Sequence, residues 1–112
     1  MMKTSIARYT RRPVRYFKAV LNGRLIQFLK AVESDPRIGT THIAVYVGLF
    51  ELWCENDGKD PVSFNREVVM KAAKIQSRST YYGCIKGLHE YGYIRYIPSH
   101  HPVLENLVFM GV

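Results

Sequence analysis

Residues 66–97, REVVMKAAKIQSRSTYYGCIKGLHEYGYIRYI, contain two short helical patterns, a tight turn and a strand pattern, and they decide the fold. The first helix is predicted over residues 66–73, with Asn65 as its N-cap, because a short polar side chain there can accept a backbone N–H bond. Its buried side is expected to hold Val68, Val69, Ala72 and Ala73. The two alanines are small, so another helix can approach this side closely.

A second helix is predicted over residues 78–91, after a turn at residues 74–76 in which Ile75 points inward. Ser77 serves as its N-cap and Gly92 ends it. At about 100° per residue, Tyr81, Cys84, Ile85 and Leu88 share one face, and the other sides hold Arg78, Ser79, Tyr82, Gly83, Lys86 and Glu90. This helix is therefore expected to bury one face and to leave the opposite face free.

Strand patterns lie on both sides of these helices. Residues 93–97, YIRYI, are aromatic and β-branched, which favours a strand. After a loop at residues 98–102, residues 104–110 return as a second strand, and residues 61–64 form a short strand before the helices. The sequence thus predicts an α+β fold that is mainly α with a small β-hairpin.

A single domain is expected over residues 14–112, preceded by an arm at residues 1–13. Residues 1–13 lack a stable apolar period and predict a flexible basic arm. The N-terminal helical segment of this domain covers residues 14–38. Apolar side chains recur at helical spacing in it from residue 14 to residue 34. This spacing predicts a helix with a possible break at Asn22-Gly23.

A helix over residues 42–55, with Thr40 or Thr41 as its N-cap, is apolar around most of its circumference. Such a helix must be buried on more than one side, and one side can face the two helices of residues 66–91. The other apolar face consists of Leu49 or Leu52 and Trp53. It needs a cover from the N-terminal helix or from a second copy of the chain, so a homodimer is one expected arrangement.

The net charge of +7 is distributed unevenly over the 112 residues. Residues 1–24 hold seven basic side chains and no acid, residues 25–60 hold three basic and six acidic side chains, and residues 61–112 hold six basic and three acidic ones. Two basic regions that flank an acidic middle suit a polyanionic partner touched by both ends. The alternative is a solvated basic tail with no partner.

Several classes of function find no support in the sequence. No apolar run approaches the roughly 18 residues that span a bilayer, and no signal peptide is visible, so we expect a cytoplasmic protein without a membrane partner. Cys54 and Cys84 fit buried free thiols. The histidines, which lack zinc-ligand spacing with these cysteines, are His42, His89, His100 and His101. No cofactor and no enzymatic activity are expected.

A short strand, two short helices with a tight turn, and a hairpin form the arrangement of a winged helix-turn-helix, here with an N-terminal helical extension. The free face of its second helix can enter a major groove, which is about 12 Å wide. The residues expected to contact DNA are Ser77, Arg78, Ser79, Thr80, Tyr82 and Lys86 on this helix and its cap, Arg95 and His100 in the wing, and Arg11 and Arg12 in the arm. The alternatives are that Tyr82 packs against the wing, Lys86 is a solvated charge and His100 lies in a solvated loop.

Part of this region resembles the recognition helix and first wing strand of bacterial winged-helix regulators and replication initiators. The residues that carry the resemblance are Ser77-Arg78-Ser79-Thr80-Tyr81-Tyr82, Ile85, Leu88 and Tyr91-Gly92-Tyr93-Ile94. Residues 41–99 also resemble short winged-helix proteins of bacterial conjugative and mobilisable elements. The resemblance implies that Arg78, Ser79, Tyr82 and Lys86 face DNA. Many such regulators carry an appended ligand or ATPase domain that this chain lacks, so we expect no small-molecule effector.

Two functions from different classes remain open. In the first, the protein reads double-stranded DNA as a dimer and regulates transcription, excision or replication. It would then be associated with the bacterial nucleoid. In the second, the domain is a protein-interaction module of a replication or mobilisation complex and makes little direct DNA contact. The basic arm, Arg78 and Lys86 discriminate between them, because DNA binding through such groups weakens steeply with salt.

Overall fold

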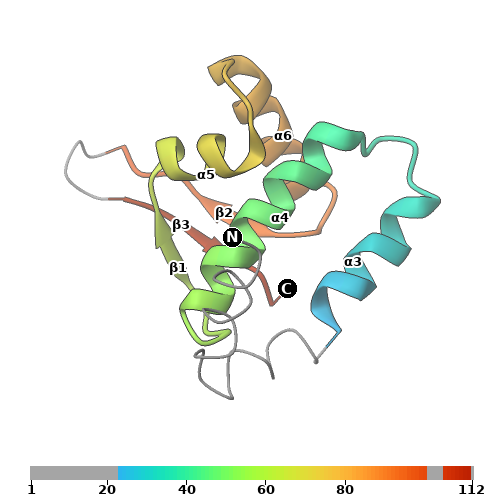
Figure 1. The fold of residues 1–112 in the computed structure, drawn as a ribbon, viewed down its shortest axis with the longest axis horizontal. Helices are drawn as coiled ribbons and strands as arrows, with labels where there is room; N and C mark the ends of the chain where they lie inside the picture. The colour runs from blue at the N-terminus through green and yellow to red at the C-terminus, as the bar shows by residue number, and fades with distance from the viewer. Residues whose placement is uncertain (1–22, 101–104, 112) are drawn as a thin grey trace, which may run out of the picture.

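The computed structural model describes residues 23–100 and 105–111 (Figure 1). These residues form four helices and one three-stranded antiparallel sheet, which confirms the expected α+β class. The elements are α3 (Arg24–Glu33), α4 (Thr40–Glu55), β1 (Val62–Phe64), α5 (Arg66–Ala73), α6 (Arg78–Glu90), β2 (Arg95–Ile97) and β3 (Asn106–Phe109). The predicted arm with Arg11 and Arg12, and the part of the first predicted helix that precedes Gly23, lie outside the described residues.

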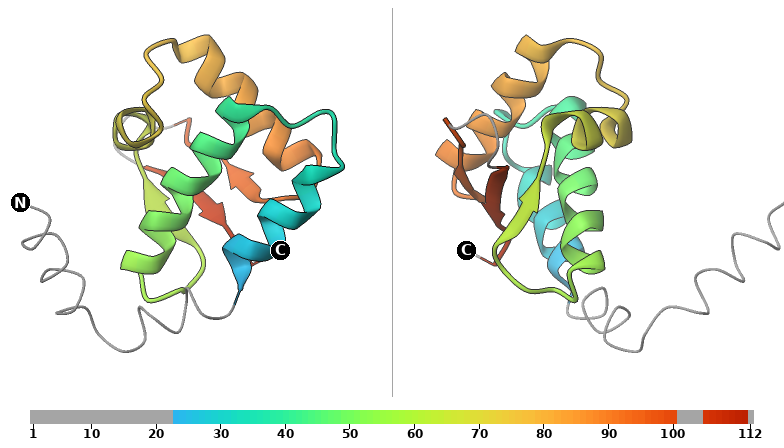
Figure 2. Two further views of the ribbon diagram at one scale, coloured as in Figure 1. Left: turned by 45° about the vertical axis from the view of Figure 1, so that its right-hand side comes forward. Right: turned by 90° about the vertical axis from the view of Figure 1, so that its left-hand side faces the viewer.

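The central helix is α4, and α3 packs along one of its sides (Figures 1 and 2). α3 begins after Gly23, at the predicted break, and the φ of +76° at this residue favours glycine. The Phe28 ring of α3 stacks on Tyr46 of α4, with 3.6 Å between ring centroids. Leu49 and Trp53, from the face that needed a cover, are buried within this one chain. That face therefore does not require a second copy.

The start of α4 differs from the prediction. The helix begins at Thr40, and Gly39 is its N-cap. His42 Nδ1 accepts the Gly39 backbone N–H at 3.1 Å, and the Gly39 carbonyl accepts the Ile43 N–H at 3.2 Å. The prediction that Thr40 or Thr41 caps this helix was therefore wrong, because the His42 side chain reaches back to the N-cap backbone.

Both α5 and α6 begin at the predicted caps. Asn65 Oδ1 accepts the Val68 N–H at 3.0 Å, and Ser77 Oγ accepts the Thr80 N–H at 3.2 Å. Between the helices, Ile75 is buried as predicted. The bounds of α5 are those predicted, and α6 ends one residue earlier. The local cap signals thus placed this helix pair correctly.

The buried side of α5 is rotated from the predicted one. Its buried residues are Val69, Met70 and Ala73. Val68 is 45% exposed and Ala72 is also exposed, so their predicted burial was wrong. An eight-residue helix that buries both Val69 and Met70 turns the preceding side chain towards solvent. The expected close approach is present, since a Cβ on Gly48 of α4 would lie 3.4 Å from Ala72 Cβ.

After α6 the chain reverses at Gly92, which has a φ of +86°. The Tyr93 N–H donates back to the last turn of the helix at 2.9 Å. The strand predicted over residues 93–97 is shorter, because Tyr93 reaches Asp35 and Ile94 enters the core. β3 is likewise shorter than predicted within its described part.

The sheet order is β1-β3-β2, so β1 joins the predicted hairpin as an outer strand. The cross-strand pairs place Val62, Tyr96 and Val108 on one face, which packs towards the helices (Figure 2). Side chains alternate between the faces of a sheet. The opposite face, termed the outer sheet face, therefore holds Arg95, Ile97, Leu107 and Phe109.

Candidate nucleic-acid interface

The helix α6 separates a buried face from an exposed face, as the sequence predicted. The predicted inner residues Tyr81, Cys84, Ile85 and Leu88 are all buried. The predicted contact residues on this helix and its cap, which are Ser77, Arg78, Ser79, Thr80, Tyr82 and Lys86, are all exposed. One side of α6 is therefore left uncovered by the described chain.

Hydroxyl groups crowd the first turn of α6. Ser77 Oγ, which caps the helix, lies 3.2 Å from Ser79 Oγ. A helix start leaves four backbone N–H groups without intrahelical partners, and the cap satisfies one of them. The remaining N–H groups and the Arg78 guanidinium, which forms no ion pair among the described residues, suit contact with an anion.

Lysines extend the positive charge from α6 across the preceding turn. Lys71 at the end of α5 and Lys74 in the turn are exposed, and within the described ranges neither forms an ion pair. We term Lys71, Lys74 and Arg78 the basic surface. Sequence reasoning did not single out the two lysines, although their place beside the predicted contact helix was a signal.

Nearby acids are paired with bases. Glu67 Oε1 lies 2.8 Å from Arg66 Nη2, and Glu90 Oε1 lies 3.9 Å from Lys86 Nζ. Both partners of the Lys86 pair are exposed, so the interaction is weak, and the alternative that Lys86 is a solvated charge stays open. The exposed side of α6 keeps a positive balance.

Tyr82 contacts α5 through its hydroxyl and its helix neighbour Tyr81 through its ring. Arg66 Nη1 donates to Tyr82 Oη at 2.9 Å, and the Tyr81 ring meets the Tyr82 ring edge-on at a centroid distance of 5.1 Å. Tyr82 remains 44% exposed. Arg66 was not predicted to belong to this site, because its contact crosses from one helix to the next and leaves no mark in the local sequence.

A groove of about 360 Å³ separates α6 from β2. Its lining residues are Tyr82, Ile85, Lys86, His89, Tyr96 and Pro98. At one end His89 Nδ1 accepts the Tyr96 backbone N–H at 3.0 Å, which ties the last turn of α6 to the hairpin. Because an accepting Nδ1 carries no proton, this bond requires the neutral ring protonated at Nε2. Sequence reasoning did not find this link.

Of the two predicted wing residues, Arg95 lies apart from the exposed side of α6. Arg95 sits on the outer sheet face, with its guanidinium carbon 5.1 Å from the Phe109 ring centroid. Its neighbour Tyr96 lines the groove, so Arg95 points the other way. His100 is exposed at the end of the described part of the loop. The structure therefore brings together the α6 residues and not Arg95 with them.

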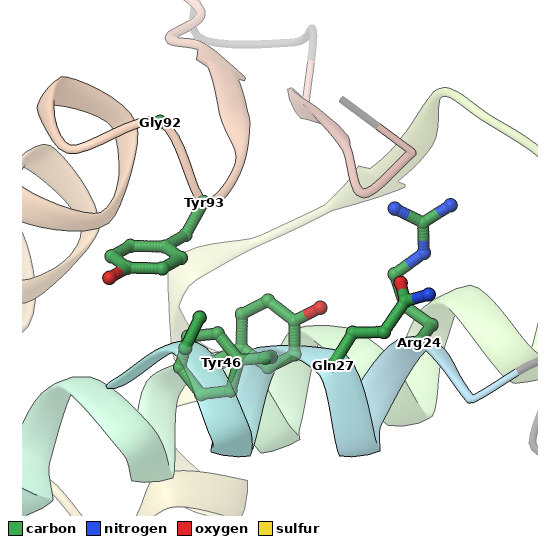
Figure 3. A pocket seen from close by; sticks show the side chains of 7 residues that line it. Arg24, Gln27, Tyr46, Gly92 and Tyr93 are labelled. Carbon is green, nitrogen blue, oxygen red and sulfur yellow. The ribbon is translucent and has the colours of Figure 1, made fainter. Parts of the chain in front are cut away.

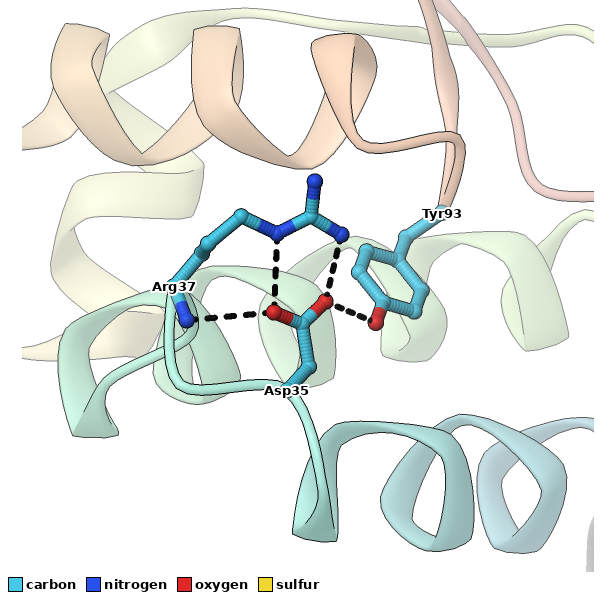
Figure 4. Close-up of polar contacts among 3 residues, drawn as sticks. All are labelled: Asp35, Arg37 and Tyr93. Carbon is cyan, nitrogen blue, oxygen red and sulfur yellow. Dashed lines mark hydrogen bonds and ion pairs between the residues drawn. The ribbon is translucent and has the colours of Figure 1, made fainter.

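The C-terminal end of α6 is fixed by a polar cluster (Figure 4). The Asp35 carboxylate accepts bonds from Arg37 Nε at 2.9 Å and Nη2 at 2.8 Å, and from the Tyr93 hydroxyl at 2.5 Å. The bonds from Arg37 and then Tyr93 hold the pKa of Asp35 well below its usual range, and the same contact raises the pKa of Tyr93. The Arg37 guanidinium also lies 4.1 Å from the Tyr91 ring centroid. The cluster ties the α3–α4 loop to the turn after α6.

A small pocket lies between α3, α4 and the same turn. Figure 3 shows Tyr46 and Tyr93 on its walls, with Arg24 and Gln27 towards one end. Its volume of about 150 Å³ is below the roughly 300 Å³ at which pockets for drug-sized ligands begin. Burial raises the pKa of Tyr46 to about 12, so its phenol carries no charge at neutral pH. The two phenols among the described lining residues, Tyr46 and Tyr93, both have raised pKa values and are therefore weak nucleophiles at neutral pH.

Other chemistry finds little support in the described residues. They contain no group of three side chains suited to hold a metal ion, and no helix among them is long and apolar enough to cross a membrane. Cys54 and Cys84 are buried free thiols, as expected. Burial raises the pKa of Cys54 to about 11, which leaves a thiol of low nucleophilicity at neutral pH.

Comparisons with protein-family models, with curated proteins and with solved structures find no match to this chain. The function is therefore inferred from the geometry and charge of the residues themselves.

Proposed function

We propose that the protein binds double-stranded DNA as a winged helix-turn-helix protein, with the N-terminal half of α6 in the major groove. The element order α4-β1-α5-α6-β2-β3 and the sheet order β1-β3-β2 support this interpretation. In it, α5 and α6 form the helix pair and β2 and β3 form the wing.

The observation that carries the proposal is the exposed side of α6. Arg78, Ser79, Tyr82 and Lys86 occupy this side, while the opposite side anchors the helix in the core. An α-helix with its side chains is about 10–12 Å across, which matches the width of the major groove. Tyr82 and Lys86 face base edges in this pose, and the first turn of α6 meets phosphates.

The basic surface supplies sequence-independent affinity. Each phosphate that Lys71, Lys74 or Arg78 neutralises releases a counterion from the DNA, so binding weakens as salt rises. Arg11, Arg12 and the other N-terminal basic residues add to this term in the proposal. The side chains of α6 then select among sequences.

A fluorescence-anisotropy titration with duplex DNA at several salt concentrations tests the proposal. We expect Lys86→Ala to weaken binding by about 1 kcal/mol or more. Lys30→Ala is the matched control, because Lys30 is also exposed and paired with a glutamate but lies on α3. Absence of duplex binding at low salt, or equal losses for both variants, would contradict the proposal.

The biological role that fits best is a regulator of transcription, excision or replication on a bacterial mobile element, acting in the cytoplasm. Two copies on adjacent half-sites would place two α6 helices about one DNA turn apart. Selection of bound sequences from random duplexes should then return an inverted repeat. A single half-site would contradict the dimer and leave DNA reading intact.

A second candidate function is a protein-interaction module of a replication or mobilisation complex. The outer sheet face favours it, since Ile97 is 38% exposed and Leu107 and Phe109 are half-buried beside it. The same selection from random duplexes distinguishes the two functions, because a protein-interaction module should select no sequence motif.

A further inference from the structure

We infer that Arg66 makes Tyr82 a hydrogen-bond donor in the major groove, so that Tyr82 selects an acceptor edge, above all guanine over cytosine. The inference rests on the proposed function and states which bases Tyr82 of α6 recognises. It starts from the 2.9 Å bond between Arg66 Nη1 and Tyr82 Oη.

The direction of this bond is fixed by chemistry. A guanidinium has only donors, so the Tyr82 oxygen must be the acceptor. The phenol then keeps its own O–H to donate elsewhere. The Tyr82 hydroxyl makes no other hydrogen bond among the described residues, and the residue is 44% exposed, so the remaining donor is accessible to a ligand.

Arg66 is itself held in place. Its Nε and Nη2 donate to Glu67 Oε1 at 3.1 and 2.8 Å, and its side chain is only partly exposed. It is the first residue of α5, directly after the Asn65 cap. A guanidinium that is bonded on both sides is more restrained than a free surface arginine, so it can orient the phenol.

The ring of Tyr82 is also fixed. The Tyr81 ring packs edge-on against it, and Tyr81 is fully buried. The Arg66 guanidinium carbon lies 6.0 Å from the Tyr82 ring centroid. The ring plane and the hydroxyl of Tyr82 are thus both oriented before DNA binds. This lowers the entropy that the side chain loses on binding.

Acceptor edges differ among the bases. In the major groove guanine presents the acceptors N7 and O6, whereas cytosine presents the N4 amino donor. A phenol whose oxygen already accepts the Arg66 bond is a better donor and a poorer acceptor, so it bonds guanine more strongly than the cytosine amino group. Without Arg66, the same phenol can rotate to accept, and the discrimination falls.

The test uses the site that the wild-type protein selects, with each base pair permuted in turn, in competition anisotropy. We expect one position at which guanine is preferred over cytosine by about five- to tenfold, the effect of one hydrogen bond on affinity. Tyr82→Phe and Arg66→Met should each abolish this preference, and the double variant should lose no more than either single one. Arg66→Lys, which keeps a donor, should retain part of it.

Lys71→Met is the matched control on α5, and it should weaken binding to all sequences equally. If Arg66→Met does the same while duplex binding persists, Arg66 is a phosphate contact and the inference is overturned. Additive losses in the double variant, or a lower thermal stability with unchanged base preference, would overturn it as well. Absence of duplex binding by the wild-type protein would instead overturn the proposed function, and the inference with it.

Discussion

The two ends of α6 are held in different ways. At the C-terminal end, Gly87 packs so closely on His42 that a Cβ there would lie 3.0 Å from its Nε2. His89 is bonded to β2, and the Asp35 cluster fixes the turn beyond the helix. Three separate elements thus hold this end: α4, the α3–α4 loop and the hairpin.

The N-terminal end has fewer polar supports. Ser77 caps the first turn, and the bond from Arg66 to Tyr82 is its one side-chain hydrogen bond to another element in the described chain. A Cβ on Gly83 would meet nothing within 4 Å. The fixed end sets the direction of the helix, and the open end can approach a ligand without rearranging the core.

Filling the space at Gly87 should give the largest effect. A Cβ there also lies 3.3 Å from Tyr91 Cε2, so Gly87→Leu overpacks the fixed end and should lower the free energy of unfolding by about 2–3 kcal/mol. Gly83→Leu is the matched control, since its site is open and leucine favours helix over glycine. Urea unfolding measures both variants. Equal losses would show that the two ends do not differ.

Removing the Tyr93 hydroxyl should give the next largest effect. Tyr93→Phe deletes a bond to an ionised carboxylate and should cost about 1.5 kcal/mol at pH 7. Because the folded-state pKa of Asp35 is lowered, this stabilisation is full above about pH 4 and declines as the pH falls below it. Thermal unfolding of the wild type and of Tyr93→Phe at several pH values checks whether their difference in stability falls at low pH. Tyr91→Phe keeps its ring beside Arg37 and should have little effect at any pH.

Removing the cap of the open end should cost about 1 kcal/mol. In Ser77→Ala the Thr80 N–H loses its acceptor. Ser79→Ala, which removes a hydroxyl without a capping role, is the control and should cost less than half as much. If chemical denaturation gives the two variants the same stability, Ser77 does not stabilise the start of α6.

The smallest effect is expected at the Tyr81 hydroxyl. This group is buried without a hydrogen-bond partner among the described residues, so Tyr81→Phe should be neutral or should stabilise by up to about 1 kcal/mol. Tyr96→Phe is the comparison, because the Tyr96 hydroxyl lies 3.4 Å from Asn106 Oδ1. A clear loss for Tyr81→Phe alone in differential scanning calorimetry would indicate a hidden partner, such as buried water.

The sequence predicted what depends on neighbours along the chain. Asn65 and Ser77 mark the starts of α5 and α6, and the helical period of α6 separates its faces, because caps and periodicity act over a few residues. The DNA-contacting role of that exposed side stays a prediction.

The missed features depend on distant contacts. Val68 is exposed because tertiary packing selects Val69 and Met70 instead. The Asp35–Tyr93 bond joins residues 58 positions apart, and the Arg66–Tyr82 bond joins residues 16 apart. No local pattern encodes such pairs, so they became visible only in the fold.

The most direct test of the central claim is an NMR titration of the ¹⁵N-labelled protein with its selected duplex. We predict that backbone amide shifts concentrate between Ser77 and Lys86 and around the basic surface, while α3 changes little. Shifts that cluster on the outer sheet face, or no shifts at saturating duplex, would contradict the claim that α6 is the DNA-reading element.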